Sequence, residues 1–212
     1  MTDRTMRERK KEATKIGILN AAIELINKHG FAETTMQQIS DKADVALRTL
    51  YNYFPSKESI VATYIHSVVE NEAQIRWDQI INLDSTYDKL FFMCRISAQW
   101  MAENPTLIEV YALEPRQYFF GPETEEIPRS GYEGIVEKVI AIGQEQGDIS
   151  RAFSAAVITQ QYMGVYYCNI LTWLGNPERD LLEIFKEGLD IFCHGIKAAS
   201  VDNGSIFVGM FL

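Results

Sequence analysis

Residues 47–53 carry side chains that can hydrogen-bond a nucleic acid. In a helix, Leu50 and Phe54 would share the buried face, whereas Arg48, Thr49 and Asn52 would point outward. Guanidinium, hydroxyl and amide groups can bond both base edges and phosphate oxygens. From the spacing alone, an ordinary solvent-exposed helix hairpin explains this pattern equally well.

Two short helices and a tight turn have to position that segment. Thr35 followed by Gln38 three residues later is a typical helix start, and the turn falls near Asp44. Pro55 requires the second helix to stop before it. An apolar helix over residues 12–29 can bury its face against both short helices. The sequence therefore predicts a three-helix head that contains a helix-turn-helix.

A specific motif runs through this head: Thr35-x3-Ile39-x3-Ala43-x-Val45-x3-Thr49-Leu50-Tyr51-x-Tyr53-Phe54-x-Ser56-Lys57. Over residues 12–65 the chain resembles the DNA-binding head of the TetR family of bacterial transcriptional regulators. Asp44 and Ala46 depart from the family pattern, which usually has glycine and then Ser or Thr at these positions. Asp tolerates positive φ, and loss of a hydroxyl N-cap typically costs about 1 kcal/mol. Neither departure removes a candidate DNA contact.

Candidate DNA-binding residues follow from this resemblance. It implies that one group of side chains contacts the phosphate backbone, namely Thr35, Thr49, Tyr51, Tyr53 and Lys57. Leu47, Arg48 and Asn52 are then left to read base edges, and Gln37 completes the candidate set.

Charge is distributed unevenly along the chain. The formal net charge of −9 argues against a protein that coats nucleic acid generally. Residues 1–60 nevertheless hold ten Lys/Arg against eight Asp/Glu, whereas residues 61–212 hold 10 against 21. Residues 4–15 form a basic lead-in, expected either as a flexible arm that reaches phosphate or the minor groove, or as a solvated tail. An acidic body would help to orient the basic end toward DNA.

The rest of the chain predicts more helices. A helix over residues 57–81 has no Gly or Pro inside it. The resemblance implies that this helix shifts when ligand binds, so it is a candidate lever that would transmit ligand binding to the head. Five further helices are expected, over residues 86–103, 105–118, 129–146, 151–174 and 177–199. The expected architecture is all-α, with a DNA-binding helix-turn-helix domain (1–56), a ligand-binding and dimerisation domain (57–199), and an apolar tail of unassigned role (200–212).

Aromatic and sulfur-containing side chains crowd the body helices. Plain core is the usual role of any single one, but tyrosine and tryptophan also supply the polar groups of ligand pockets. The aromatic side chains expected to line a ligand pocket are Trp100, Tyr111 and Tyr166. The side chains expected to bind the polar groups of the ligand are Gln99, Glu109 and Glu114.

The last helix is apolar on more than one face, which exceeds what one core requires. Together with the resemblance, this implies a homodimer whose last two helices form a four-helix bundle. The candidate interface residues are Leu181, Phe185, Gly188 and Phe192. A buried central helix in a monomer is the alternative.

Other kinds of site are not indicated. Cys94, Cys168 and Cys193 are widely spaced in apolar surroundings and are expected to be reduced core residues. The scattered histidines predict no metal site, and no cofactor is expected. No apolar stretch behind Met1 resembles a signal peptide, so a cytoplasmic protein is the default expectation.

The sequence therefore indicates a homodimeric repressor that binds a pseudo-palindromic operator and is released by a small, largely apolar effector. The alternative is an architectural or partner-regulated DNA-binding protein without a small ligand, which a well-packed body lacking a pocket would favour. A third possibility, an enzyme, has no supporting motif, since the sequence has no GxSxG, P-loop, dinucleotide fingerprint or metal-ligand spacing.

Overall fold

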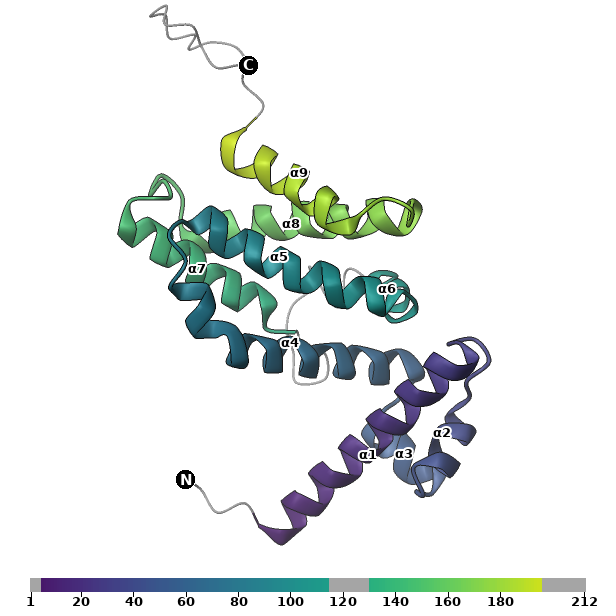
Figure 1. Ribbon diagram of the computed structural model, residues 1–212. Coiled ribbons are helices and arrows are strands. Elements are labelled where there is room, and N and C mark those ends of the chain that lie inside the picture. The colour runs from purple at the N-terminus through teal and green to yellow at the C-terminus, as the bar shows by residue number, and fades with distance from the viewer. Residues whose placement is uncertain (1–4, 115–129, 196–212) are drawn as a thin grey trace, which may run out of the picture.

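The computed structural model describes residues 5–114 and 130–195, which form helices joined by short connections (Figure 1). No strand occurs within those two ranges, and this confirms the all-α class. The helices, in chain order, are α1 (Met6–His29), α2 (Met36–Lys42), α3 (Leu47–Tyr53), α4 (Lys57–Ile81), α5 (Thr86–Glu103), α6 (Pro105–Ala112), α7 (Tyr132–Gln146), α8 (Ala155–Gly175) and α9 (Leu181–His194).

The helices form a small head and a larger body. Helices α1, α2 and α3 make the head at one end of the molecule, and α5 to α9 stack on one side of α4 (Figure 1). Within the body, α8 packs against α7 and α9, and α9 also packs against α5. Helix α4 contacts α1 in the head and α5, α6 and α7 in the body, so it connects the two parts.

A small apolar cluster holds the head together. Its buried members come from four helices and are Ile18, Leu19, Ala22, Ile39, Leu50, Phe54 and Ile60. The burial of Leu50 and Phe54 confirms the expected inward face of α3. Ile60 of α4 belongs to this head cluster, whereas the next residue, Val61, belongs to the core of the body. The first turns of α4 are thus shared by two close-packed cores, one in the head and one in the body.

The N-terminal lead-in is helical rather than a flexible arm, which corrects the expectation that the first helix starts near residue 12. Helix α1 begins at Met6 because Thr5 and Glu8 form a capping box. The Glu8 backbone N–H donates to Thr5 Oγ1 at 3.3 Å, and the Thr5 backbone N–H donates to Glu8 Oε2 at 2.8 Å. The basic residues that follow therefore lie on a rigid element.

Several body helices are shorter than expected. Helix α8 starts at Ala155 and α9 at Leu181, because Ser154 and Asp180 accept hydrogen bonds from first-turn backbone N–H groups. Helix α7 starts at Tyr132, and α6 ends at Ala112. Residues 115–129, between α6 and α7, and the expected apolar tail at residues 200–212 lie outside the described residues.

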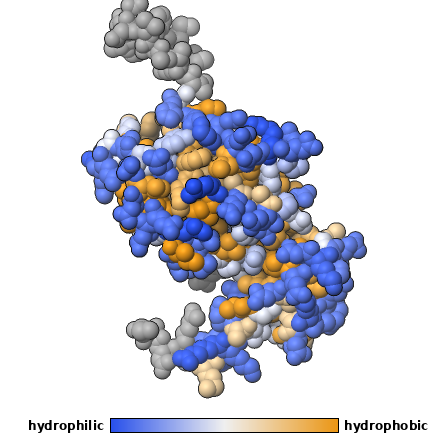
Figure 2. Space-filling model, viewed as in Figure 1, coloured by the Kyte–Doolittle hydropathy of each residue, from blue (hydrophilic) through white to orange (hydrophobic). Residues whose placement is uncertain are grey.

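The surface differs between the two parts. On the face shown in Figure 2, hydrophobic residues gather on the body, whereas the outer edge of the head is largely hydrophilic. Cys94 is buried as expected, but Cys168 and Cys193 are exposed, because they fall on the outer faces of α8 and α9. No described helix is long and apolar enough to cross a membrane. Residues 5–114 and 130–195 also contain no group of three metal-ligating side chains.

Candidate nucleic-acid interface and ligand cavity

The turn between α2 and α3 closes without glycine. Asp44 adopts φ of 52°, which confirms that it takes the left-handed position. The Val45 backbone N–H donates to the Ser40 carbonyl at 3.0 Å across the turn. At the start of α2, the Gln38 backbone N–H donates to Thr35 Oγ1 at 3.2 Å, which confirms the predicted cap. Two short helices are thus held at a fixed angle with few residues between them.

Helix α3 presents its polar side chains to solvent. Leu50 is fully buried beneath it, whereas Arg48, Tyr51 and Asn52 are exposed. These three side chains form no hydrogen bond with other described residues and are available to a partner. Ala46, at the N-cap, supplies no side-chain hydrogen bond, as expected. One face of α3 is therefore fixed by packing and the other is open.

Three other candidates on α3 are half-buried. Leu47 and Tyr53 pack partly against the head cluster, so only part of each is available to a partner. Thr49 is also half-buried. The six α3 candidates thus lie on one short helix, three of them exposed and three half-buried.

The remaining candidate DNA-binding residues already have partners within the head. Gln37 Nε2 donates to Asp41 Oδ1 at 2.7 Å, and the Thr35 hydroxyl caps α2. Lys57 Nζ donates to the Phe31 carbonyl at 2.6 Å and lies 4.4 Å from the Phe31 ring centroid. An ammonium group has three donors, so Lys57 can keep this bond and still donate to a phosphate.

The body encloses a cavity of about 370 Å³ between α4, α5, α6, α7 and α8. Three candidates, Trp100, Tyr111 and Tyr166, line it. The other described lining residues are Ile65, Val68, Val69, Glu72, Ala73, Ile80, Met93, Ile96, Ser97, Met101, Ile108, Ala112, Ser130, Gly131, Tyr132, Glu133, Gly134, Ile135, Glu137, Met163 and Ile170. Most of these are apolar, so the cavity suits a largely apolar ligand.

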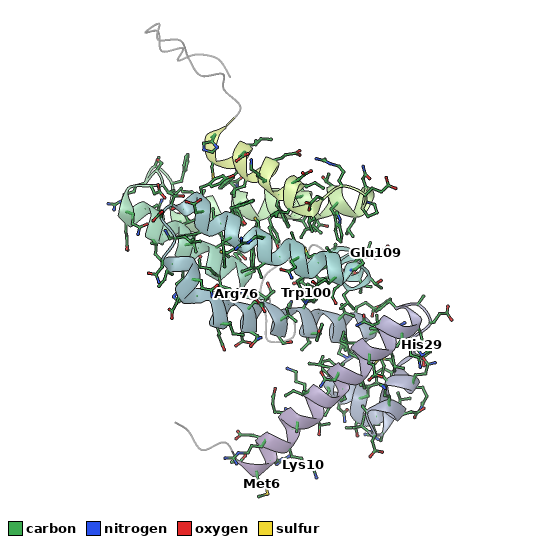
Figure 3. All side chains as sticks on the ribbon, viewed as in Figure 1. Met6, Lys10, His29, Arg76, Trp100 and Glu109 are labelled. Atoms are coloured by element: carbon green, nitrogen blue, oxygen red, sulfur yellow. The ribbon has the colours of Figure 1, made fainter. Side chains whose placement is uncertain are left out.

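The three expected polar anchors do not reach this cavity. Gln99, Glu109 and Glu114 are exposed and absent from its lining. Figure 3 shows Glu109 at the outer end of the body, and Trp100 between α4 and α5. Successive residues on a helix point about 100° apart, so Gln99 faces solvent where its neighbour Trp100 faces inward. The carboxylates in the lining are instead Glu72, Glu133 and Glu137, and Glu72 accepts from Arg76 at 2.5 Å.

A buried cluster of polar side chains adjoins the cavity, and Ser97, Tyr132 and Tyr166 of this cluster line it. Tyr132 and Tyr162 approach with their hydroxyls 3.3 Å apart, and Tyr162 lies equally close to Cys94 Sγ. Burial raises the pKa of Tyr132 and Tyr166, partly offset by hydrogen bonds to Ser97. All three phenols therefore stay protonated at neutral pH. Sequence reasoning missed Ser97 and Tyr132 because neither stands in a recognisable motif.

Helix α4 lines the cavity and is also linked to the α6 part of its wall by a polar contact. His66 Nε2 lies 2.9 Å from Tyr111 Oη, and the two rings meet edge to face with centroids 5.7 Å apart. Burial lowers the pKa of His66 to about 4, so its imidazole is neutral at pH 7. Tyr111 lines the cavity from α6, whereas His66 stands on the helix that enters the head.

The expected interface side chains lie mostly inside one protomer, which corrects their assignment. Leu181 and Phe185 are at most 2% exposed, and the Phe185 ring stacks on Tyr166 with centroids 4.8 Å apart. A Cβ at Gly188 would lie 2.3 Å from Asn169 Nδ2, so this glycine permits close packing of α8 and α9 in the same chain. Phe192 is half-buried against Tyr162. The wide apolar band of α9 is thus largely used within the protomer's own core.

Comparison with known proteins agrees with this arrangement. Residues 18–64, which span the helix-turn-helix, match the family described as bacterial regulatory proteins, tetR family. The fatty acid metabolism regulator protein of Bacillus subtilis (strain 168) is 25% identical over 182 residues, covering 84% of this chain and 93% of that protein. The transcriptional repressor KstR of Mycobacterium tuberculosis is 27% identical over 169 residues, covering 79% of this chain and 72% of that protein.

The whole fold also has a solved counterpart. The structure of Thermus thermophilus FadR, described as a TetR family transcriptional repressor in complex with lauroyl-CoA, superposes with a TM-score of 0.74. That match covers 90% of this chain and 100% of the other, at 22% identity. Together with the helix-turn-helix geometry, these likenesses identify the head of this chain, over residues 18–64, as that of the TetR family of bacterial regulatory proteins, and show that the body shares the fold of a solved TetR family repressor.

Proposed function

We propose that this protein is a homodimeric transcriptional repressor that binds a pseudo-palindromic operator and is released from it by a small, largely apolar effector. The observation that carries the proposal is the position of the cavity. Helix α4 lines it with Ile65, Val68 and Val69, and the same helix contributes Ile60 to the head cluster. A ligand in the cavity thus contacts the element on which the head is mounted.

Operator recognition would use the open face of α3. Arg48 and Asn52 supply a guanidinium for guanine and an amide for adenine, and Tyr51 supplies a phenol for a phosphate. In a two-fold symmetric dimer, two such helices enter major grooves about 34 Å apart. The operator should therefore consist of two inverted half-sites.

The dimer would form through the outer faces of α8 and α9. Val157, Gln161, Gly164, Cys168 and Leu171 recur at spacings of four and three residues along α8, which is the spacing of a helix-packing seam. Val157 and Leu171 are each 44% exposed, and Ile191 on α9 is 57% exposed. The proposed interface thus uses exposed side chains of the two helices predicted from the sequence, and not the buried Leu181 and Phe185.

The effector class follows from the lining and from the relatives. An apolar wall suits a hydrocarbon chain or ring system, and FadR from Thermus thermophilus was solved with lauroyl-CoA. The ionisable groups among the described lining residues are tyrosines and the three carboxylates, which disfavour an anionic group beside them. We therefore propose that the acyl part of an acyl thioester occupies this cavity, with its anionic head beyond the described lining.

Release would follow from differential affinity. An effector weakens DNA binding only if it binds better to a form whose heads are spaced wrongly for the operator. Because the coupling is reciprocal, the operator must weaken effector binding by the same factor. The architectural alternative, with no small ligand, has less support, because the body is not packed solid.

Selection of random duplex DNA by the purified protein, at two salt concentrations, tests the operator half of the proposal. We expect enrichment of a two-fold symmetric site whose binding weakens steeply with salt. Absence of any enriched sequence at either salt would exclude a specific operator. Enrichment of a site that no acyl-CoA of any chain length releases would favour the architectural alternative.

A further inference from the structure

The first three turns of α1 extend beyond the rest of the head. Every residue from Thr5 to Ala13 is exposed, and burial begins only further along the helix, at Ile18. Figure 1 shows this end of α1 running past α2 and α3, away from the body. Figure 3 shows Met6 and Lys10 at the free end. This overhang lies before residue 18, where the match to the family begins.

The overhang carries a basic stripe, which we define as Arg7, Lys10, Lys11 and Thr14. These positions follow the i, i+3, i+4, i+7 pattern and share one helix face. The carboxylates of Glu8 and Glu12 fall outside the stripe on the helical wheel. The three basic residues are exposed and form no ion pair with any other described residue.

The basic stripe continues the face of α1 that packs on the helix-turn-helix. Counting in steps of four and three residues from Arg7 leads through Lys11 and Thr14 to Ile18, and the same series reaches Leu25. Ile18 and Leu25 both pack in or against the head cluster. The face is thus apolar where α2 and α3 cover it and basic where the helix projects past them. The basic stripe therefore lies next to the molecule that the helix-turn-helix binds.

We propose that the basic stripe is a second DNA-binding surface, which holds backbone phosphates flanking the half-site that α3 reads. This rests on the proposed operator binding and extends it to a surface that the family match does not include. Arg7 lies about 16 Å from Ile18 along the helix axis, which corresponds to about five base pairs of B-DNA.

The helical state of the overhang determines the kind of contact. A helix with its side chains is about 10–12 Å across, whereas the minor groove is about 6 Å wide. The overhang therefore lies across the backbone and does not thread the minor groove as an extended arm would. Its lysine and arginine side chains bind phosphates as sequence-independent cations. The stripe contributes affinity and salt dependence without base preference.

Two matched arginines provide the test. Arg7 and Arg9 are both exposed and close in sequence, but Arg9 lies on the opposite face of α1. Glutamine is a good helix former, so Arg7→Gln and Arg9→Gln should keep the overhang helical while removing the same charge. The triple variant Arg7→Gln/Lys10→Gln/Lys11→Gln removes the cations of the stripe. Far-ultraviolet circular dichroism checks that helix content is unchanged.

Binding to the selected operator is then measured by fluorescence anisotropy between 50 and 200 mM salt. Each lost phosphate contact should reduce the salt slope by about 0.9, and should reduce the ratio of the affinities at 50 and 200 mM salt about 3.5-fold. The triple variant loses three contacts in each half-site, so this ratio should fall about 40-fold for one half-site and roughly 2,000-fold for a dimer on the full operator. Arg9→Gln should match the wild type. Trimming the duplex by about five base pairs outside each half-site should weaken the wild type but not the triple variant.

Two results would overturn the inference while leaving the proposed function intact. One is an operator-binding wild type whose salt slope equals that of the triple variant. The other is a triple variant that enriches a different flanking sequence, since that would make the stripe a base reader. A wild type that enriches no operator at all would instead refute the proposed function itself. The expected outcome is a reduced slope with an unchanged sequence preference.

Discussion

The hydrogen bond between Tyr111 and His66 is the most direct place to break the link between cavity and head. Tyr111→Phe removes only the phenol oxygen that lies 2.9 Å from His66 Nε2. Tyr111 is buried and His66 is half-buried, so loss of this hydrogen bond should cost about 1–3 kcal/mol. In a chain of this size, 1 kcal/mol shifts Tm by about 2–4 °C, so the variant should melt about 2–12 °C lower.

The effect on regulation should exceed the effect on stability. Allosteric couplings typically change affinity about 5–150-fold, and we expect the wild-type operator Kd to rise within that range at saturating acyl-CoA. In Tyr111→Phe this ratio should fall, because the hydrogen bond that links Tyr111 of the cavity wall to His66 of α4 is lost, although α4 still lines the cavity directly. Anisotropy titrations of labelled operator, with and without effector, measure the ratio directly.

Tyr87→Phe is the matched control. Tyr87 Oη donates to Asp190 Oδ1 at 2.6 Å and joins α5 to α9, but Tyr87 does not line the cavity. The control should keep the wild-type ratio even if it melts lower. The double variant Tyr111→Phe/His66→Phe makes both partners apolar, so it should regain part of the lost stability without regaining the coupling. A Tyr111→Phe protein with the full wild-type ratio would refute this reasoning.

Three further predictions concern other parts of the molecule. Burial lowers the pKa of His66 to about 4, below its ordinary value of about 6.5, so the unfolded chain binds more protons between these pH values. Stability should therefore fall by up to about 3 kcal/mol as pH is lowered from 6.5 toward 4, and urea denaturation of His66→Phe should show a smaller loss. Arg48→Ala should relax the enriched sequence at one position in each half-site, at a cost of about 1–3 kcal/mol, whereas a uniform loss on all sequences would make Arg48 a phosphate contact. Leu171→Glu should shift sedimentation from dimer to monomer, because a carboxylate cannot be buried unpaired in the proposed seam, whereas the exposed Leu113→Glu should not.

The head could be predicted in detail because its determinants are local. Thr35 with Gln38 specifies a helix start, Asp44 specifies the turn, and Pro55 stops the next helix, each within a few residues. The start of α1 was missed even though Thr5 and Glu8 have the same spacing as Thr35 and Gln38. The basic composition of residues 4–15 indicates a flexible arm or a solvated tail, whereas the capping box of Thr5 and Glu8 specifies a helix start.

The cavity could be predicted only in part. Trp100, Tyr111 and Tyr166 line it, because large aromatic side chains on a helix tend to face the interior. The polar residues of the lining could not be predicted from composition. Gln99 directly precedes Trp100 in the chain, yet it points to another side of the helix and is exposed. His66 was missed because its partner is 45 residues away in the chain. Contacts of that range depend on how helices pack.

The interface residues show why an apolar pattern alone cannot separate a core from a surface. Leu181 and Phe185 belong to the wide apolar band of α9, yet both are buried within one chain, where Phe185 stacks on Tyr166. The exposed residues of α8, Val157 and Leu171, are individually unremarkable in the sequence. They form a seam only after packing has fixed which face of α8 is left open.

The central claim is that one molecule of this protein cannot hold operator and effector equally well at the same time. The most direct test measures effector affinity by calorimetry, with lauroyl-CoA as the probe, in the absence of DNA and then with saturating operator duplex. The account predicts that operator weakens lauroyl-CoA binding by the same factor by which lauroyl-CoA weakens operator binding. Binding of lauroyl-CoA with equal affinity in both conditions would contradict it.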